Sequence, residues 1–485
     1  MHIKHPLIAV NSQPRSAAPS PPVLVAEHPV KIYPRTVSGR YASWRWVMVW
    51  LTQLFFYGMP WLNWNGRQAL LFDLTERRFY VLGLVLQPQD FIYLAVLLVI
   101  SALALFFFTA IAGRLWCGYS CPQTVYTELF LWIERRTEGD RSARIRLDAM
   151  PWGWHKLRRK GAKHGLWLML SLFTGFSFVG YFSPIRELPA ALLQPAESAW
   201  LWFWVLFYGA ATYGNAGFLR EQMCKFMCPY ARFQSALIDM DSLVIAYDGA
   251  RGESRGPRAR KTDHRSAGLG DCVDCTLCVQ VCPTGIDIRN GLQNECIACA
   301  ACIDVCNGVM DRMGYERGLI RYTSGRAVAQ GWGPRQMLAR IWRPRVIIYG
   351  VLLLAIGSAW LWSLNHRRDF SAVLIKDRGS LARFGANGSI ENTFRLQVTN
   401  SQEEARAFVL RLDSAPDLPL RIDSATRIQV DAAGTNAMPV RLVLPATVAA
   451  AHAGQTLDLS LLVSPLAPAA ADASTRLPVR FTVPR

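Results

Sequence analysis

The chain has 485 residues, of which 51% are hydrophobic and only 18% are charged, and it contains 17 tryptophans. Soluble domains usually carry about 25% charged residues. This composition excludes a disordered or fibrous chain and disfavours an ordinary soluble enzyme. The net charge of +18 would suit either nucleic-acid binding or a membrane protein, so the position of the charge must decide between them.

Residues 1–43 predict a disordered cytoplasmic tail, because prolines and scattered serines leave no apolar core. The apolar stretch at residues 8–10 is too short for a signal peptide. We therefore expect the first membrane span to act as an uncleaved anchor.

Five apolar runs contain no Asp, Glu, Lys, Arg or His, and each is close to the roughly 20 residues that cross a bilayer. They cover residues 46–64, 91–112, 165–182, 199–219 and 346–364. Tryptophan and tyrosine gather at their ends, as in an aromatic belt. We predict a bundle of five transmembrane helices, with spans one to four inside residues 44–220 and the fifth at 346–364. Buried core helices of a large soluble protein are the alternative.

Lysine and arginine are concentrated in alternate segments between these runs. The net charges are +5, +6 and +5 for residues 1–64, 114–164 and 220–345, against 0, −1 and +3 for residues 65–90, 183–198 and 365–485. The positive-inside rule makes the first group cytoplasmic. This predicts a multi-pass protein with its N-terminus in the cytoplasm and its C-terminus outside. The +18 is then mostly a topology signal, with membrane lipid as partner and no nucleic acid.

Residues 365–485 change character, because short segments alternate apolar and polar side chains between turn residues. Examples are residues 394–398, 440–444 and 479–483. About seven such strands predict an antiparallel sandwich of immunoglobulin type. The segment has no cysteine and no histidine cluster, so we expect a binding or support module on the outer side.

The strongest chemical signal is a doubled cysteine motif in the predicted cytoplasmic segment 221–345. The spacing C-x2-C-x2-C-x3-C occurs twice, at Cys272, Cys275, Cys278 and Cys282 and at Cys296, Cys299, Cys302 and Cys306. In two-cluster ferredoxins, three closely spaced thiolates and one from the other motif hold each [4Fe–4S] cluster. The spacing predicts a ferredoxin-like domain at about residues 262–315. Its two ligand sets are Cys272, Cys275, Cys278 and Cys306, and Cys296, Cys299, Cys302 and Cys282.

Two zinc sites are the alternative, since C-x2-C pairs also bind zinc. The repeated three-residue step to each fourth cysteine favours clusters. One departure from the motif is Asn307, which stands where a proline is expected after Cys306. That position shapes a turn and supplies no ligand.

Two further cysteine pairs share the pattern C-x3-C-P, namely Cys117 with Cys121 and Cys224 with Cys228. Each follows a predicted span that runs toward the cytoplasm, so the two pairs should lie at equal depth. Four sulfurs brought together would form a soft site suited to Cu(I). A dithiol/disulfide switch and inert buried cysteines stay open. Additional iron–sulfur ligation is less favoured, because the two-residue step is missing.

At these residues the chain resembles the FixG/RdxA/CcoG family, the membrane polyferredoxins called cytochrome c oxidase accessory proteins. The resemblance covers about residues 30–485. It is carried by WCGYSCPQTV at residues 116–125, CKFMCPY at 224–230, the doubled cysteine motif and the sandwich tail. Electron-transfer proteins of nitrate and nitrous-oxide reductases share the two pairs.

The resemblance implies a protein of the bacterial inner (cytoplasmic) membrane with a periplasmic sandwich, acting in assembly of the cbb3-type cytochrome oxidase. It implies reduction of Cu(II) to Cu(I) on the cytoplasmic side, in a form that a copper-exporting ATPase can use. The eight cysteines from Cys272 to Cys306 would hold two [4Fe–4S] clusters. The candidate copper or redox centre would be Cys117, Cys121, Cys224 and Cys228.

Three functions follow from these features. The first is an iron–sulfur oxidoreductase that reduces Cu(II) with electrons from an unknown cytoplasmic donor. The second is an electron relay to a quinone or a reductase partner, and the third is a non-enzymatic scaffold for oxidase subunits. A relay to the outer side needs a carrier there, and the outer segments contain no cysteine. This favours the first function over the second, and the third is compatible with the first.

Overall fold

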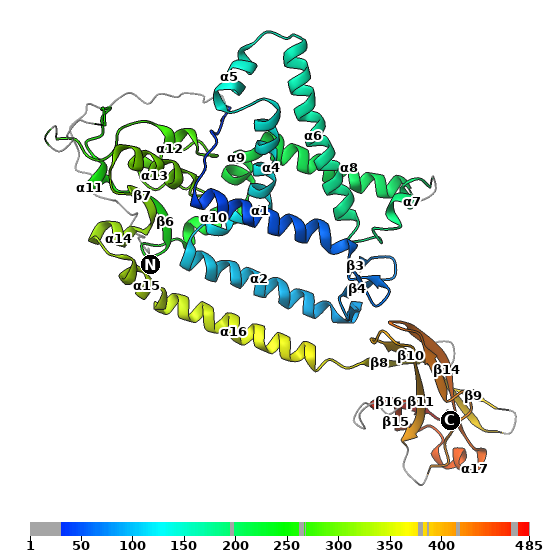
Figure 1. Ribbon diagram of the computed structural model, residues 1–485. Helices are drawn as coiled ribbons and strands as arrows, with labels where there is room; N and C mark the ends of the chain where they lie inside the picture. The colour runs from blue at the N-terminus through cyan, green and yellow to red at the C-terminus, as the bar shows by residue number, and fades with distance from the viewer. Residues whose placement is uncertain are drawn as a thin grey trace, which may run out of the picture.

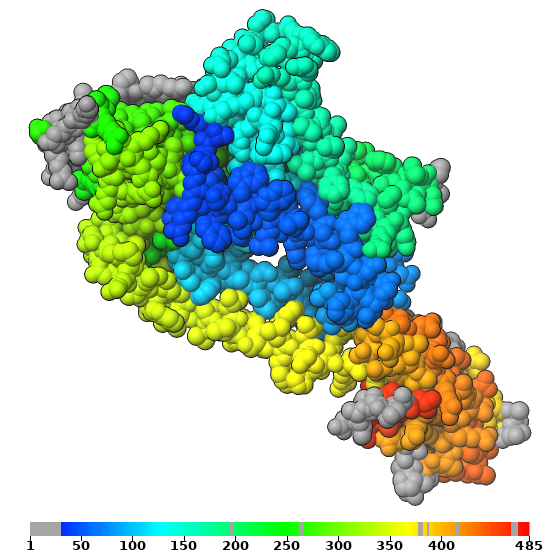
Figure 2. Space-filling view, viewed as in Figure 1, coloured from blue at the N-terminus to red at the C-terminus, as the bar shows by residue number. Residues whose placement is uncertain are grey.

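The computed structural model describes residues 31–194, 198–260, 266, 268–376, 382–385, 388–413, 418–466 and 474–484. A group of long helices occupies the centre of the molecule (Figure 1). A region of short strands and small helices lies at one end of this group, and an all-β lobe lies at the other. Figure 2 shows the β lobe as a separate body beyond the last long helix.

The N-terminal segment has a defined structure from residue 31 onward, so the predicted disordered tail is wrong for residues 31–43. The backbone N–H of Arg35 donates to the carbonyl oxygen of Gln280 at 2.9 Å. The Tyr33 hydroxyl donates to Asp148 at 2.6 Å. Helix α1 already begins at Arg40. The first 30 residues of the predicted tail lie outside the described residues.

All five predicted spans are helical, with shifted boundaries. They correspond to α1 (Arg40–Gly58), α2 (Phe91–Ala112), α6 (Trp154–Val179), α8 (Ser198–Gly214) and α16 (Pro344–Asn365). The first run ends early because Pro60 lies in a 3-10 turn that follows Gly58. The fourth run continues past α8 as a π-helix, Asn215–Leu219.

Two of these helices are long and apolar enough to cross a membrane, judged by length and composition over the described residues. They are Pro88–Ala112, which includes the short turn before α2, and Pro344–Asn365. At most 6% of their most apolar stretch is buried, unlike the core helix of a soluble protein. The five-helix bundle therefore stays a prediction for α1, α6 and α8.

Large apolar side chains are nevertheless exposed on all five helices. Examples, one from each helix, are Leu54, Leu98, Met169, Leu206 and Leu354, exposed by 51% to 71%. Exposed apolar surface of this extent marks contact with a membrane or a partner. Helix α2 packs on α16, and α6 packs on α8.

Short strands join α1 to α2 at the end of the helices that faces the β lobe. They form a three-stranded antiparallel sheet of β3 (Leu70–Asp73), β4 (Arg78–Val81) and β5 (Leu84–Leu86). The backbone N–H of Phe72 on β3 donates to the Tyr181 carbonyl at 2.7 Å, which fixes this sheet to the segment that follows α6.

The doubled cysteine motif is enclosed by an antiparallel pair of strands, β6 (Leu243–Tyr247) and β7 (Ile320–Ser324). Each half of the motif is a loop followed by a helix. The first helix, α12 (Leu277–Gln280), stops just before Cys282-Pro283. The second, α13 (Ala301–Met313), continues through Asn307, because asparagine, unlike proline, fits a helix interior. The absence of a proline at position 307 thus allows α13 to be longer than α12. The two cysteine loops that precede these helices are not affected.

The C-terminal segment forms the predicted antiparallel sandwich of two sheets. One sheet has the order β12-β14-β10-β8, with β9 paired to β10, and the other has the order β13-β11-β15-β16. Inward-facing residues such as Phe394, Leu396, Val398, Leu461 and Val463 form its core. The nine strands among the described residues are β8 (Phe370–Lys376), β9 (Arg383–Phe384), β10 (Ile390–Asn400), β11 (Arg406–Asp413), β12 (Arg421–Ile422), β13 (Arg427–Val430), β14 (Thr435–Leu444), β15 (Thr456–Pro465) and β16 (Thr475–Thr482).

Candidate metal centre

The structure brings the eight cysteines of the doubled motif together around two cavities. The first cavity is lined by Cys272, Cys275, Cys278 and Cys306. The second is lined by Cys282, Cys296, Cys299 and Cys302. These are the two crossed ligand sets that the spacing predicts. Cys278 borders both cavities, so the two are adjacent.

The two cysteine loops share an unusual backbone conformation. Asp274 and Thr276 flank Cys275 with positive φ angles of 53° and 55°, and Ala298 and Ala300 flank Cys299 with 55° and 59°. Side chains other than glycine rarely adopt this conformation, and it concentrates at functional sites. Left-handed residues between right-handed ones turn backbone N–H groups into a concave, anion-binding surface, as at many iron–sulfur sites. The loops are therefore shaped to surround a negatively charged group.

Burial raises the pKa of the Cys278 thiol to about 11 and that of the Cys306 thiol to about 12. Burial also raises the pKa of Cys296 to about 12. Such thiols are protonated at neutral pH unless a metal displaces the proton. Their ionisation is thus coupled to metal binding.

The spacing of the side chains distinguishes a cluster from a single ion. Among the described residues, which include all twelve cysteines, no three His, Cys, Asp or Glu side chains lie close enough to hold one metal ion. A zinc ion needs four ligands at about 2.3 Å. A four-iron cluster spreads its ligands around a larger body, which suits the two cavities. The donor set therefore fits [4Fe–4S] clusters better than zinc.

The two C-x3-C-P pairs adopt the same local structure. Cys121 and Cys228 are extended residues that directly precede the helices α4 (Pro122–Thr137) and α10 (Pro229–Leu237). Proline suits the first helical position of each, since its missing N–H has no partner there anyway. Cys117 lies one turn earlier on α3 (Leu115–Tyr119), and Cys224 lies in a π-helix, Met223–Met227.

These four cysteines converge, as their positions after spans two and four predict. Burial raises the pKa of Cys117 to about 12, and the nearby thiols of Cys121 and Cys224 add to the effect. Burial likewise raises the pKa of Cys224 to about 11, with contributions from Cys121 and Cys228. Cys121 also interacts with Cys228. Each thiol thus lies within electrostatic range of at least two others, and we call this group the four-cysteine centre.

The four-cysteine centre adjoins the second cavity. Cys117 and Cys224 pack against an apolar cluster that includes Ile297 and Cys299. Arg114 connects the two sites, because its guanidinium donates to the carbonyl oxygens of Asn294 and Ala231. The order in space is therefore first cavity, second cavity, four-cysteine centre.

Polar side chains fix the two pairs relative to each other. Gln234 on α10 accepts a hydrogen bond from the Cys117 thiol at 3.3 Å. Gln123, two residues after Cys121, donates to the carbonyls of Asn215 and Arg220 at 2.9 and 3.2 Å. Each pair is thus held by the chain segment that carries the other.

Several residues around the cavities were not identified from the sequence. Arg45 on α1 is only 8% exposed, and its charge acts against the burial that raises the pKa of Cys299. Asp304 accepts hydrogen bonds from the N–H groups of Tyr41 and Ala42 at 3.2 and 2.7 Å, so α13 caps the start of α1. In the sequence Arg45 looks like one more cytoplasmic charge, and nothing there pairs Asp304 with residue 42.

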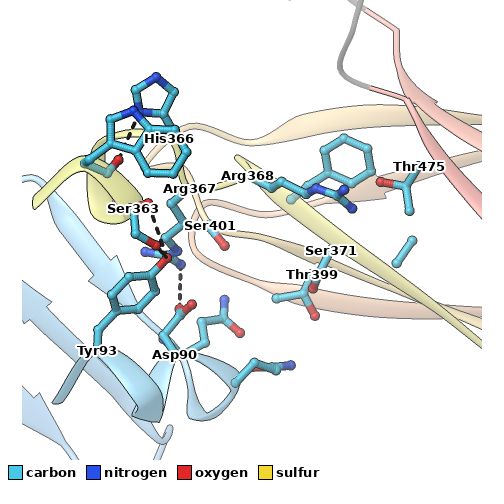
Figure 3. A pocket seen from close by; sticks show the side chains of 15 residues that line it. Asp90, Tyr93, Ser363, His366, Arg367, Arg368, Ser371, Thr399, Ser401 and Thr475 are labelled. Carbon is cyan, nitrogen blue, oxygen red and sulfur yellow. Dashed lines mark hydrogen bonds and ion pairs between the residues drawn. The ribbon is translucent and has the colours of Figure 1, made fainter. Parts of the chain in front are cut away.

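A larger cavity lies away from all the cysteines, between the ends of α2 and α16 and the sandwich (Figure 3). Arg367 forms an ion pair with Asp90 at 2.7 Å, and the hydroxyls of Tyr93 and Ser363 are 3.2 Å apart. None of the residues that line it is a cysteine. The Gln87 side-chain amide donates to the Asn400 carbonyl of β10 at 3.3 Å, so this cavity lies where the sandwich contacts the helices.

Comparison with protein families assigns the chemistry of the cysteines. A model described as a 4Fe-4S dicluster domain matches residues 219–325, and one described as a 4Fe-4S binding domain matches residues 94–138. With the two cavities, these matches define an iron–sulfur electron-transfer protein of the oxidoreductase class. A third model, described as the IG-like fold at the C-terminal of FixG, matches residues 360–484.

Curated relatives extend over most of the chain. Protein RdxB of Cereibacter sphaeroides is 40% identical over 446 residues, covering 90% of this chain and 93% of the relative. Nitrogen fixation protein FixG of Rhizobium meliloti is 38% identical and covers 81% of each chain. Protein RdxA of Cereibacter sphaeroides is 38% identical, covering 86% and 89%. The chain therefore belongs to the FixG/RdxA family.

Among solved structures, a FixG-related protein from Vibrio parahaemolyticus aligns with 24% of this chain and 97% of its own length. The two are 18% identical, with a TM-score of 0.20.

Proposed function

We propose that this protein reduces Cu(II) to Cu(I) at the cytoplasmic face of the bacterial inner membrane, in support of cbb3-type oxidase assembly. The observation that carries the proposal is the linear order of two cluster cavities and the four-cysteine centre. Bound [4Fe–4S] clusters supply single electrons, and the reduction of Cu(II) to Cu(I) takes one electron.

The exposed and buried cysteines indicate in which direction electrons would pass along this order. Cys275 in the first cavity is exposed, whereas Cys299 in the second is buried. A cytoplasmic electron donor can therefore approach the first cavity. The buried Arg45 beside Cys299 stabilises negative charge at the second cavity, which favours electron transfer from the first cavity to the second.

The four-cysteine centre offers the chemistry that favours Cu(I). Sulfur ligands are soft and stabilise Cu(I) relative to Cu(II). Met227 lies between Cys224 and Cys228 in the sequence, and its side chain is 57% exposed. This exposed thioether is one more soft sulfur ligand close in sequence to the centre. We propose that the product passes to a copper-exporting ATPase, which serves the oxidase.

The test uses the full-length protein, purified without oxygen, with its clusters reduced chemically. Cu(II) is added, and Cu(I) is followed with a chelator that absorbs visible light. We expect rapid Cu(I) formation by the parent and at least a tenfold slower rate in the Cys121→Ser/Cys228→Ser variant. An equal rate in both would exclude the four-cysteine centre as the site of reduction. A parent that forms no Cu(I) would refute the proposed function.

The sandwich suggests a second, compatible role in holding subunits of the oxidase. It has its own core, and Gln87, which lies shortly before α2, donates to the Asn400 carbonyl of β10 at 3.3 Å. A chain that ends after Asn365 should reduce Cu(II) at the parental rate but fail to support oxidase assembly in cells. Normal assembly with this truncated chain would exclude the scaffold role.

A further inference from the structure

We propose that Cys117, Cys121, Cys224 and Cys228 together hold a third [4Fe–4S] cluster, with two ligands from each of two distant segments. This deepens the proposed function, because it names the group at the end of the electron path. It does not depend on copper being the acceptor.

The first argument is the incomplete ligand set of one family match. The model described as a 4Fe-4S binding domain covers residues 94–138, which contain only two cysteines, Cys117 and Cys121. A cubane cluster needs four protein ligands. The structure brings the second pair to this one, because Cys117 and Cys224 pack against the same apolar cluster and Cys117 donates to Gln234 of the helix that follows Cys228. The two motifs thus complete one ligand set.

The second argument is the spacing of the four sulfurs. Each lies within electrostatic range of at least two of the others, and among the described residues no three of them form a site for a single metal ion. The same holds for the ligand sets of the two ferredoxin cavities. A body larger than one ion, bound from several sides, fits all three arrangements.

The third argument is the positive potential around the centre. Cys121 and Cys228 stand at the N-termini of α4 and α10, helices of 16 and 9 residues. Helix N-termini favour negative charge, and a cluster with four thiolates is an anion. The side chains of Cys121 and Cys228 make no capping hydrogen bond to these helices, so they do not occupy the N-terminal N–H groups. The site is therefore organised for an anionic group that both helices can face.

The side chain of Arg114 gives a separate argument for a group bound at this centre. Arg114 is only 8% exposed, and its Nε–H has no hydrogen-bond acceptor among the described residues. Its charge acts on Cys117 and Cys224 of the four-cysteine centre and on Cys296 of the second cavity. A cluster sulfur at the four-cysteine centre would provide an acceptor for this buried N–H. Arg114 would then lie between the second and third clusters.

The electron count for the proposed reaction is simple. One reduced cluster gives one electron to one Cu(II), so the cluster is oxidised by one unit, copper becomes Cu(I), and no proton moves. The ferredoxin clusters restore the electron, and a one-electron donor in the cytoplasm restores theirs. Copper is then reduced beside the cluster, at a centre whose sulfur atoms favour Cu(I).

The test is the iron and sulfide content of the full-length protein after anaerobic reconstitution. Three clusters give about twelve iron and twelve sulfide per chain, and two give about eight. We expect about twelve in the parent and about eight in the Cys121→Ser/Cys228→Ser variant. Eight in both would overturn the inference. Eight iron with one Cu(I) bound by the parent alone would assign the four thiols to copper instead.

A second variant distinguishes the loss of a cluster from a general loss of folding. Cys272→Ser/Cys296→Ser removes one ligand from each ferredoxin cavity and leaves the four-cysteine centre intact. This variant should retain about four iron and the electron paramagnetic resonance signal of one reduced cluster. Complete loss of the signal, in protein that still inserts into membranes, would contradict a third cluster. Twelve iron in a parent that cannot reduce Cu(II) would uphold this inference and refute the proposed function.

Discussion

Gly118 lies directly against the backbone of Ile297. A Cβ atom added at Gly118 would be 2.7 Å from the Ile297 carbonyl oxygen and 2.8 Å from that of Ala298. Gly118 follows Cys117, and Ile297 follows Cys296. The contact therefore joins the four-cysteine centre to the loop of the second cavity, and only glycine permits this approach.

Replacing Gly118 tests the proximity of the two sites. Gly118→Ala should push the segments apart, at a cost of about 1–3 kcal/mol in stability. The ferredoxin clusters should remain, and Cu(I) should form at least tenfold more slowly. Iron content, melting temperature and the rate of Cu(I) formation check this. Gly308→Ala is the matched control, because no atom beyond the neighbouring residues and the backbone of α13 itself lies within 4 Å of the added Cβ. Alanine there should stabilise α13 by about 0.5–1 kcal/mol.

The crossed ligand sets predict which cysteine variants resemble each other. Cys272→Ser and Cys306→Ser should each remove the cluster of the first cavity and give matching spectra. Cys282→Ser should resemble Cys296→Ser instead. Each variant should lose about four iron. Iron analysis and electron paramagnetic resonance of the reduced proteins test this. If Cys306→Ser resembled Cys296→Ser, each cluster would be held by one uninterrupted motif.

Glu134 is the centre of a buried group of charges and should be essential for stability. Its carboxylate accepts hydrogen bonds from Arg144 and Arg220, each at 2.7 Å, and the residue is 2% exposed. Glu134→Ala leaves two buried cations without their partner, which should cost about 3–5 kcal/mol. Thermal unfolding in detergent measures the loss. The control Glu76→Ala removes an exposed ion pair and should change stability by less than about 1 kcal/mol.

The same carboxylate predicts a pH dependence. Burial raises the pKa of Glu134, but Arg220 and Arg144 outweigh it and lower the pKa overall. A lowered pKa means that the stabilisation is complete above the ordinary value of about 4.3 and is lost as the pH falls through the folded value. The parent should therefore lose stability on acidification below about pH 4, and Glu134→Ala should lose less. Parallel curves for the two proteins would show that Glu134 does not titrate on unfolding.

Helix α16 predicts opposite sides for the clusters and the sandwich. It begins at Pro344, after the ferredoxin region, and ends at Asn365, before the first strand of the sandwich. A reporter that is active only in the periplasm should be active when fused after residue 485 and silent when fused near Gly270. The opposite result would reverse the orientation inferred from the charges.

The cysteine sites were readable from the sequence because local spacing defines them. The doubled motif predicts the two cavities, and the equal depth of two spans predicts the meeting of Cys121 with Cys228. What could not be predicted depends on contacts between distant segments. The capping of α1 by Asp304 and the ion pair of Glu134 with Arg220 join residues that are 262 and 86 positions apart. Neither pair has a local pattern that distinguishes it from ordinary surface charge.

The division of the four-cysteine centre between two segments constrains when it can be loaded. Cys117 and Cys228 are separated by about 110 residues, and ribosomes add roughly 5–20 residues per second. The first pair therefore exists for roughly 5–20 s before the second pair is synthesised, and the predicted third and fourth spans must enter the membrane meanwhile. Metal insertion must follow translation of this region. A chain truncated between the two pairs would expose two thiols that lack the other half of their centre.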